Sequence, residues 1–252
     1  MSTNKRSVVI TGGASGIGLA AAQQFVGAGH RVIILDLDRE RAASAAEEMR
    51  SAGGEVDVVG VDLAEPAEIE QAVDSVLALG GCDVLVNNAG IHPKINGSNA
   101  KIAEIEFQHW ELVLRVNLTA PFLLAQKLVP GMVERNWGRV INVSSRAGRT
   151  FSPNAGLHYA ASKAGLIGMT RQLAGEVAAR GVTVNAVAPG PVTTDLSARS
   201  SPEARERLVR SVPAARFAEV REIASAVLYL AQDGASYVNG AVIDVNGGGF
   251  MG

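Results

Sequence analysis

Tyr159 and Lys163 have the residue types and the spacing of a proton-transfer pair. They lie four residues apart in the segment YAASK, and in a helix this spacing places both side chains on one face. A tyrosine hydroxyl has a pKa of about 10, so it is a poor base at neutral pH unless a neighbouring ammonium group stabilises the phenolate. Polar pairs at this spacing are also common on solvated helix faces, so the pair alone permits both interpretations.

A glycine-rich segment, TGGASGIG, lies between an apolar run and an Ala-rich stretch near the N-terminus. Gly12 would allow a sharp turn, Gly16 a close approach of the backbone to a pyrophosphate, and Gly18 close packing of a helix on the sheet. The helix that follows would offer unpaired N–H groups and the positive end of its dipole to phosphate groups. The residues predicted to bind the phosphates are Gly12, Ser15, Gly16, Ile17 and Gly18.

Acidic residues end the second and third predicted strands. Asp36 follows the glycine-rich turn by about 20 residues, where a carboxylate accepts hydrogen bonds from the ribose hydroxyls of NAD and repels the 2′-phosphate of NADP. A carboxylate that only caps the next turn would explain Asp36 as well. Asp62 would hold the adenine amino group or N-cap the next helix, with Leu63 beside it. The sequence therefore predicts NAD(H) as the cofactor.

Short β-branched runs alternate with longer Ala-rich stretches along the whole chain. The runs show little alternation of polar and apolar residues, as is typical of parallel strands buried on both faces. This order predicts an α/β fold, Rossmann-like and doubly wound, with a mostly parallel sheet and helices on both faces, in a single domain of residues 1–252. The predicted helices span residues 16–29, 39–52, 66–79, 106–134, 156–180 and 220–231.

The bulk composition excludes several classes of protein. The chain has 252 residues and a formal net charge of −2, which gives no basic field for nucleic acid or an anionic membrane. No stretch approaches the ~20 uninterrupted apolar residues of a membrane span, and without a recognisable signal peptide a cytoplasmic protein is expected. Cys82 is the only cysteine, so we predict that its side chain is a small buried apolar group and that it binds no metal.

Four motifs occur in order along the chain: TGGASGIG, NNAG (87–90), NVSS…YAASK (142–163) and APG (188–190). With these motifs the chain resembles a short-chain dehydrogenase/reductase of the roughly 250-residue type, over almost its whole length. The resemblance implies a Rossmann fold with a seven-stranded sheet, a nicotinamide cofactor, and hydride transfer to or from a carbon that bears oxygen.

The resemblance also implies a catalytic tetrad of Asn117, Ser145, Tyr159 and Lys163. Ser145 matches the family pattern better than Ser144 and would hold the substrate oxygen. Asn117 would hold a water that links Lys163 to solvent, and Lys163 would also bind the nicotinamide ribose. The further cofactor contacts that we predict are Asn88, Ala89, Gly90, Pro189, Gly190, Val192 and Thr194, together with Tyr159 and Lys163.

Two polar segments, 91–105 and 189–213, follow strand ends and are predicted to be loops beside the ligand crevice. Residues 195–215 resemble a mobile lid over the substrate. The residues nearest the tetrad that would select the substrate are His92, Arg146 and His158, and more distant candidates include Asn96 and Arg199. Polar groups here favour a small hydroxylated or anionic substrate, such as a sugar, a polyol or a hydroxy acid.

Two other functions are open at this point. One is the reduction of 3-oxoacyl thioesters with NADPH. Asp36 argues against this function, because its carboxylate would repel the 2′-phosphate of NADPH. The other is a nucleotide-sensing or scaffold protein, which would have no need for the Tyr159–Lys163 pair. The resemblance further implies a homotetramer, or a dimer, through the two longest predicted helices, so Trp110, Phe122 and Leu123 lie either in the core or in an interface.

Overall fold

The computed structural model describes residues 5–94, 100–194 and 202–252. Its strands form one parallel sheet of seven strands in the order β3-β2-β1-β4-β5-β6-β7, which confirms the predicted doubly wound fold. The strands β5 and β6 are buried at every position, as expected for mostly apolar strands covered on both faces, although each also buries polar side chains. The strands are β1 (Ser7–Thr11), β2 (Arg31–Asp36), β3 (Glu55–Gly60), β4 (Val84–Asn87), β5 (Gly138–Val143), β6 (Val182–Pro189) and β7 (Val242–Val245).

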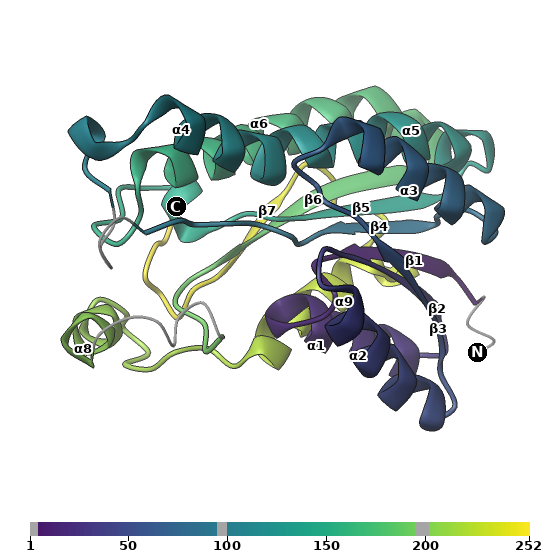
Figure 1. The fold of residues 1–252 in the computed structure, drawn as a ribbon, viewed down its shortest axis with the longest axis horizontal. Coiled ribbons are helices and arrows are strands. Elements are labelled where there is room, and N and C mark those ends of the chain that lie inside the picture. The colour runs from purple at the N-terminus through teal and green to yellow at the C-terminus, as the bar shows by residue number, and fades with distance from the viewer. Residues whose placement is uncertain (1–4, 95–99, 195–201) are drawn as a thin grey trace.

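Helices cover both faces of the sheet (Figure 1). One face carries α1, α2 and α9, and the other carries α3, α4, α5 and α6. Phe25 is the largest fully buried side chain of the first layer, and Leu124 and Met132 are prominent in the second. The helices are α1 (Gly16–Gly27), α2 (Arg39–Ser51), α3 (Pro66–Ala78), α4 (Phe107–Leu114), α5 (Ala120–Glu134), α6 (Leu157–Val177), α8 (Pro202–Arg210) and α9 (Val220–Ala231).

Two helical segments differ from their prediction. The single helix predicted over 106–134 is divided by a π-helical turn at Arg115–Thr119, which inserts one extra residue per turn and so rotates the side chains beside it. The predicted loop 189–213 contains the helix α8, whose sequence, PEARERLVR, has few apolar residues to signal it. A 2.6 Å ion pair between Glu206 and Arg210 supports its last turn instead.

One continuous helical segment among the described residues, Phe107–Glu134, has the length and composition of a membrane span. Half of the most apolar 18-residue stretch of this segment is buried inside the structure. Its Leu124 and Leu128 belong to the hydrophobic core between the helices and the sheet. A core helix of a globular protein has the same properties, so the segment is weak support for a membrane protein.

Candidate active site

Tyr159 and Lys163 lie in the first two turns of α6, close to the end of β5. The Lys163 Nζ donates a hydrogen bond to the Val143 carbonyl oxygen at 2.8 Å and lies 5.8 Å from the centre of the Tyr159 ring. The backbones approach closely because position 148 is a glycine, where an added Cβ would come 2.6 Å from the carbonyl carbon of Lys163. Lys163 is 3% exposed, so the alternative of a solvated helix face is wrong for this pair.

Burial governs the protonation of both groups. It raises the pKa of Tyr159, against a smaller opposite effect from a side-chain hydrogen bond with Ser145. Burial also lowers the pKa of Lys163 to about 8, so the ammonium form still predominates at neutral pH. With the 5.8 Å to the ring centre taken as the charge separation and an effective dielectric constant of ~20, an ammonium stabilises a phenolate by about 3 kcal/mol, or about 100-fold in acidity. The pair can therefore accept and return a proton that an isolated tyrosine could not.

The adjacent serines have different partners. The Ser144 hydroxyl is buried and donates to the Lys163 carbonyl oxygen at 2.8 Å, so it fastens the end of β5 to α6. The Ser145 hydroxyl accepts a hydrogen bond from the Ala147 N–H at 3.1 Å and hydrogen-bonds the Tyr159 side chain. Of the two serines, Ser145 thus faces the tyrosine, at the position that the sequence motif favours.

Asn117 lies fully buried in the π-helical turn between α4 and α5. Its side chain accepts from the Ile91 N–H at 2.8 Å and donates to the Ile91 carbonyl at 3.0 Å and to the Ser162 hydroxyl at 3.1 Å. A Cβ on Gly90 would lie 3.2 Å from the Lys163 Nζ and 3.4 Å from the Asn117 Oδ1. Asn117 therefore ties the loop after β4 to α6 beside the ammonium group, and its predicted contact with a water stays a prediction.

The glycine-rich turn has the conformation that its residues predict. Gly12 and Gly16 have φ angles of +65° and +54°, in the left-handed region that favours glycine. An added Cβ on Gly18 would lie 2.1 Å from the Gly12 carbonyl oxygen and 2.6 Å from the Asn88 Nδ2, so Gly18 packs against the turn and β4. Ser15 is the N-cap residue of α1 and makes no side-chain capping bond, which leaves the N-terminus of α1 suited to a phosphate.

Asp36 lies at the carboxyl end of β2, beside this turn. Its carboxylate accepts hydrogen bonds from the Ala14 N–H at 2.9 Å and the Asp38 N–H at 3.0 Å. Each oxygen keeps a further lone pair, so the turn-capping interpretation and the ribose interpretation are compatible. Leu37, the next residue, is a large exposed hydrophobic side chain at the strand end.

Asp62 does not N-cap α3, so that alternative is wrong. The N-cap residue is Glu65, and the Asp62 carboxylate instead accepts from the Ala64 N–H at 2.8 Å in a local turn. Leu63 is buried in the core beneath it. The adenine contact predicted for Asp62 and Leu63 remains a prediction.

The side-chain amide groups of the two asparagines at the end of β4 donate to protein atoms, whereas the Asn87 Oδ1 is buried without a partner. The Asn88 amide donates to the Thr11 and Gly12 carbonyl oxygens at 2.9 and 3.1 Å, which holds the glycine-rich turn onto β4. The Asn87 amide donates to the Asn142 side chain at 2.8 Å. The side chain of Asn88 thus shapes the cofactor site from behind, a role that the sequence prediction of a direct contact did not foresee.

The chain after β6 reaches the glycine-rich turn. Thr194 lies beside Gly16, where an added Cβ would be 3.6 Å from the Thr194 Cγ2. Gly190 packs on the backbone of Asn246, because a Cβ there would come 2.8 Å from the Asn246 Cα. Val192 is buried in an isolated bridge with the segment before α9. The predicted cofactor residues Pro189, Gly190, Val192 and Thr194 therefore follow a path toward α1.

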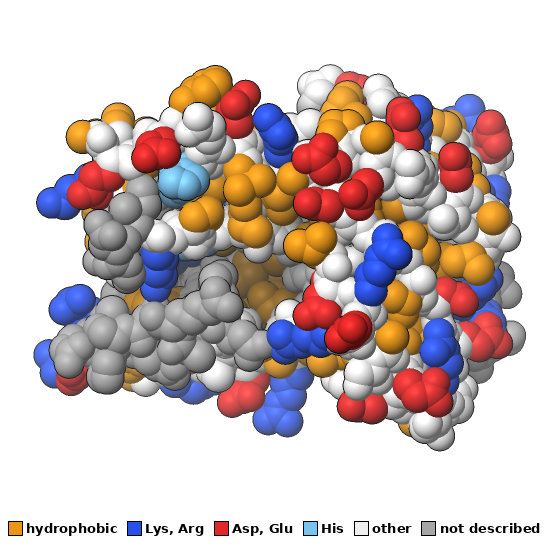
Figure 2. Space-filling view, in the orientation of Figure 1, with side chains coloured by type: hydrophobic (Ala, Val, Ile, Leu, Met, Phe, Trp, Pro, Cys, Tyr) orange, Lys and Arg blue, Asp and Glu red, His pale blue; other side chains and the backbone are white. Residues whose placement is uncertain are grey.

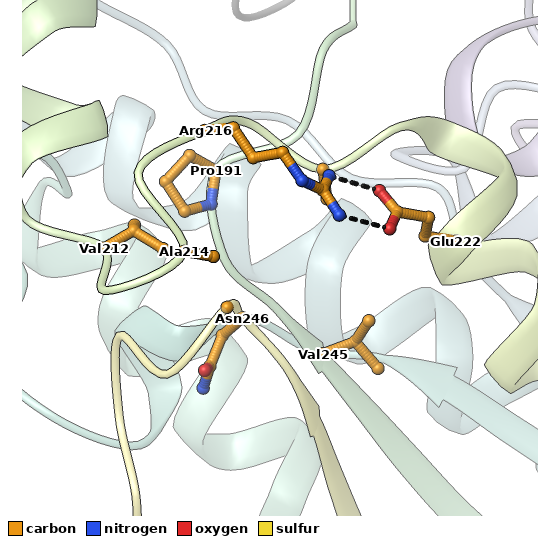
Figure 3. Close-up of a pocket in the computed structure, with 9 residues that line it drawn as sticks. Pro191, Val212, Ala214, Arg216, Glu222, Val245 and Asn246 are labelled. Carbon is orange, nitrogen blue, oxygen red and sulfur yellow. Dashed lines mark hydrogen bonds and ion pairs between the residues drawn. The ribbon is translucent and has the colours of Figure 1, made fainter.

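A cavity of about 130 Å³ lies behind this path (Figure 3). Arg216 and Glu222 form two hydrogen bonds of 2.7 Å beside it, and the carboxylate of Glu222 has its pKa lowered to about 2, chiefly by the Arg216 hydrogen bond. The lining of this cavity includes Val212 and Ala214 of the predicted lid and none of the predicted tetrad. The cavity therefore lies at the base of the predicted lid. The lining residues are Pro191, Val212, Ala214, Arg216, Ala218, Glu222, Val245, Asn246 and Gly247.

His92 and His158 lie next to the tyrosine but differ in their contacts. The His92 ring stacks on the Tyr159 ring at 4.4 Å, and its Nε2 accepts from the Gly156 N–H at 3.2 Å. Burial, then the charges of His158 and Lys94, lowers the pKa of His92 to about 4, so it is neutral at physiological pH. His158 is almost fully buried, and its pKa is also lowered by burial. Neither histidine offers a positive charge to a substrate.

Arg146 is the third predicted substrate residue, and it is 8% exposed directly after Ser145. A hollow with hydrophobic side chains in its floor opens between the two helical layers near the carboxyl ends of the strands (Figure 2). The candidates Asn96 and Arg199 lie outside the described residues, as do residues 195–201 of the predicted lid. The sequence missed Gly148 and Ser162, which position Lys163 and Asn117.

Comparisons with known proteins agree with this geometry. A family model described as "Enoyl-(Acyl carrier protein) reductase" matches residues 12–249. A protein of Aquifex aeolicus named 3-oxoacyl-[acyl-carrier-protein] reductase is 41% identical over 245 residues, which cover 96% of each chain.

Two solved structures share the fold over nearly their whole length. One, titled a 3-oxoacyl-[acyl-carrier protein] reductase with bound NAD from Brucella melitensis, is 39% identical with a TM-score of 0.92 and covers 99% of this chain and 93% of that one. The other, titled a putative gluconate 5-dehydrogenase from Beutenbergia cavernae with bound NADP at low occupancy, is 36% identical with a TM-score of 0.89 and covers 96% of each. The motifs, the sheet order and these matches together assign the chain to the short-chain dehydrogenase/reductase family.

Proposed function

We propose that this oxidoreductase interconverts a secondary alcohol and a ketone with NAD(H), and that its substrate is a 3-oxoacyl thioester. The observation that carries the chemistry is the contact of Ser145 with Tyr159 above a buried Lys163 ammonium. A binding module would not need to bury such a group, because burial of an ammonium costs free energy. This feature argues against the alternative of a sensor or scaffold.

The roles of the side chains follow from their positions. In the reductive direction the Tyr159 hydroxyl gives its proton to the substrate oxygen, which Ser145 holds by a hydrogen bond. Lys163 stabilises the phenolate that remains, and Asn117 keeps the neighbouring loop in place. When bound, the nicotinamide ring supplies the hydride or accepts it.

The residues around the glycine-rich turn fit a dinucleotide. The left-handed Gly12 and Gly16 and the uncapped N-terminus of α1 suit a pyrophosphate. Asp36 favours NAD over NADP, because its carboxylate would repel a 2′-phosphate. The relative from Brucella melitensis, which has bound NAD, supports this choice for a 3-oxoacyl reductase.

The charge of Asp36 is expected to decide the choice of cofactor. Asp36→Asn retains an oxygen that can accept from the Ala14 N–H but removes the repulsion of a 2′-phosphate. We expect kcat/KM with NADPH to rise about 10- to 100-fold relative to that with NADH, the range of one hydrogen bond to a charged group. Asp38→Asn, which changes the N-cap of α2, is the control and should leave the ratio near that of the wild type.

A small hydroxylated acid is the second candidate substrate. It is favoured by the positive charge of Arg146, which directly follows Ser145, and one relative at 36% identity is titled a putative gluconate 5-dehydrogenase. A 3-oxoacyl thioester is ranked first because the relatives at 39–41% identity carry that name.

A spectrophotometric screen tests the proposed function. The purified protein is titrated with NADH and NADPH and then offered 3-oxobutanoyl thioesters, hydroxy acids and polyols. Turnover of the thioester with NADH supports the proposal, and turnover with NADPH alone would contradict the role of Asp36. Binding of NADH without turnover of any compound would favour the sensor.

We further propose that the protein assembles as a homotetramer or a dimer through α4 and α5. Phe107, Leu112 and Phe122 are exposed large hydrophobic side chains on these helices, and Leu123 is partly buried in the core. Light scattering at micromolar concentration is expected to give an oligomer, and Phe122→Glu should shift it toward smaller species. A monomeric wild type would contradict the proposal.

A further inference from the structure

The side chain of Arg146 is mostly buried, but its guanidinium nitrogens are not among the fully buried polar atoms that lack a partner, so they keep contact with solvent. Within the described part of the chain the guanidinium makes no hydrogen bond or ion pair, although the side chain is only 8% exposed. Arginine stays protonated in proteins, and a buried charge without a partner costs free energy. A position of this kind is maintained where a ligand supplies the missing negative charge.

Arg149, three residues later, has protein partners for its Nη2, although its Nε is buried without one. Its Nη2 pairs with the Asp244 carboxylate at 3.1 Å and also donates to the Gly252 carbonyl oxygen, and its guanidinium lies 4.8 Å from the centre of the Phe250 ring. Because Arg149 and the Asn246 amide engage Asp244, this carboxylate does not neutralise Arg146.

The C-terminal segment closes one side of Arg146. An added Cβ on Gly249 would lie 2.5 Å from the Arg146 Nη1, so the backbone of the tail rests against the guanidinium. The other fixed neighbour is Ser145, whose side chain hydrogen-bonds Tyr159. Because Arg146 directly follows Ser145 in the chain, a group held by Arg146 would lie on the Ser145 side of the candidate site.

We propose that Arg146 binds an oxyanion of the substrate, a carboxylate or a phosphate, a few bonds from the reacting carbon. The planar fork of a guanidinium matches the two oxygens of either group. Its charge adds to that of the Lys163 ammonium and of Lys94, which lies near His92, while His92 itself is neutral. This inference rests on the oxidoreductase activity proposed above and concerns its second candidate substrate, the small hydroxylated acid, which would be preferred to its neutral analogue.

Matched substrate pairs test the inference. The pairs are 3-oxobutanoate with its N-acetylcysteamine thioester, gluconate with gluconamide, and glycerol 3-phosphate with glycerol; the last pair separates phosphate from carboxylate. We expect the wild type to prefer the charged member of at least one pair, and Arg146→Met to lower that preference in kcat/KM about 10- to 100-fold. Arg146→Lys, which keeps the charge without the fork, should retain part of it.

Thermal unfolding provides a readout that does not depend on turnover. Removal of an unpaired buried charge should leave the Tm of ligand-free Arg146→Met unchanged or higher, whereas the control Arg149→Met loses an ion pair and should have a lower Tm. Malonate or inorganic phosphate should raise the Tm of the wild type with NADH bound, and should do so less in Arg146→Met.

The outcomes separate the two proposals. Turnover with no preference for a charged member, or an equal loss for both members of a pair in Arg146→Met, would overturn the role of Arg146 and leave the oxidoreductase intact. Without turnover of any compound the oxidoreductase proposal fails, and the malonate shift then decides for or against the anion site alone.

Discussion

Tyr159→Phe is expected to lower kcat about 1,000-fold while the affinity for NADH stays within about twofold of the wild type. Loss of a positioned general acid costs about 10²- to 10⁴-fold. Phenylalanine retains the ring that stacks on His92 at 4.4 Å, so the substitution removes the hydroxyl and little packing. The measurements are hydride transfer, followed by the absorbance of reduced nicotinamide, and binding of NADH by fluorescence.

The chain offers a matched control for this substitution. Its other tyrosines, Tyr229 and Tyr237, are exposed, and Tyr237 lies fully at the surface. Tyr237→Phe should therefore keep the kcat of the wild type. If Tyr159→Phe retained more than a tenth of wild-type kcat, proton transfer by this hydroxyl would be excluded.

The sheet and the tetrad could be predicted because their residue patterns are local. A mostly apolar run without regular polar alternation, such as that of β2, is typical of a buried parallel strand, and Tyr159 and Lys163 share a helix. The predicted strand ends then bring Ser145 to the same edge as Asp36, since the carboxyl ends of parallel strands meet there.

The parts that the sequence did not predict depend on contacts between distant segments. The π-helical turn at Asn117 follows from the bonds of its side chain to Ile91 and Ser162, which no local propensity records. Asp62 does not cap α3 because the helix begins at Pro66, so that Glu65 is its N-cap residue. The sequence could not show that Arg146 lacks a partner among the described residues, because this depends on how the C-terminal tail packs against it.

Lys163→Met is the second substitution with a large expected effect, of about 100-fold in kcat/KM for alcohol oxidation at pH 7. Methionine has a similar length, so the substitution removes mainly the charge and the 2.8 Å bond to the Val143 carbonyl. Without the ammonium the phenolate of Tyr159 loses about 3 kcal/mol of stabilisation, while burial continues to raise its pKa. Activity of the variant should therefore keep rising with pH toward 10.

The wild type is expected to show the opposite alkaline behaviour. Its Lys163 loses the proton as the pH passes about 8, so kcat/KM should reach a plateau or fall above that pH. Stability provides an independent check. The folded pKa of about 8 lies below the ordinary 10.5, so between these values the unfolded chain binds more protons and a rising pH stabilises the folded state through this group. Urea unfolding from pH 7 to 10 should show this gain in the wild type and not in Lys163→Met, and equal slopes in the two proteins would mean that the ammonium is not buried.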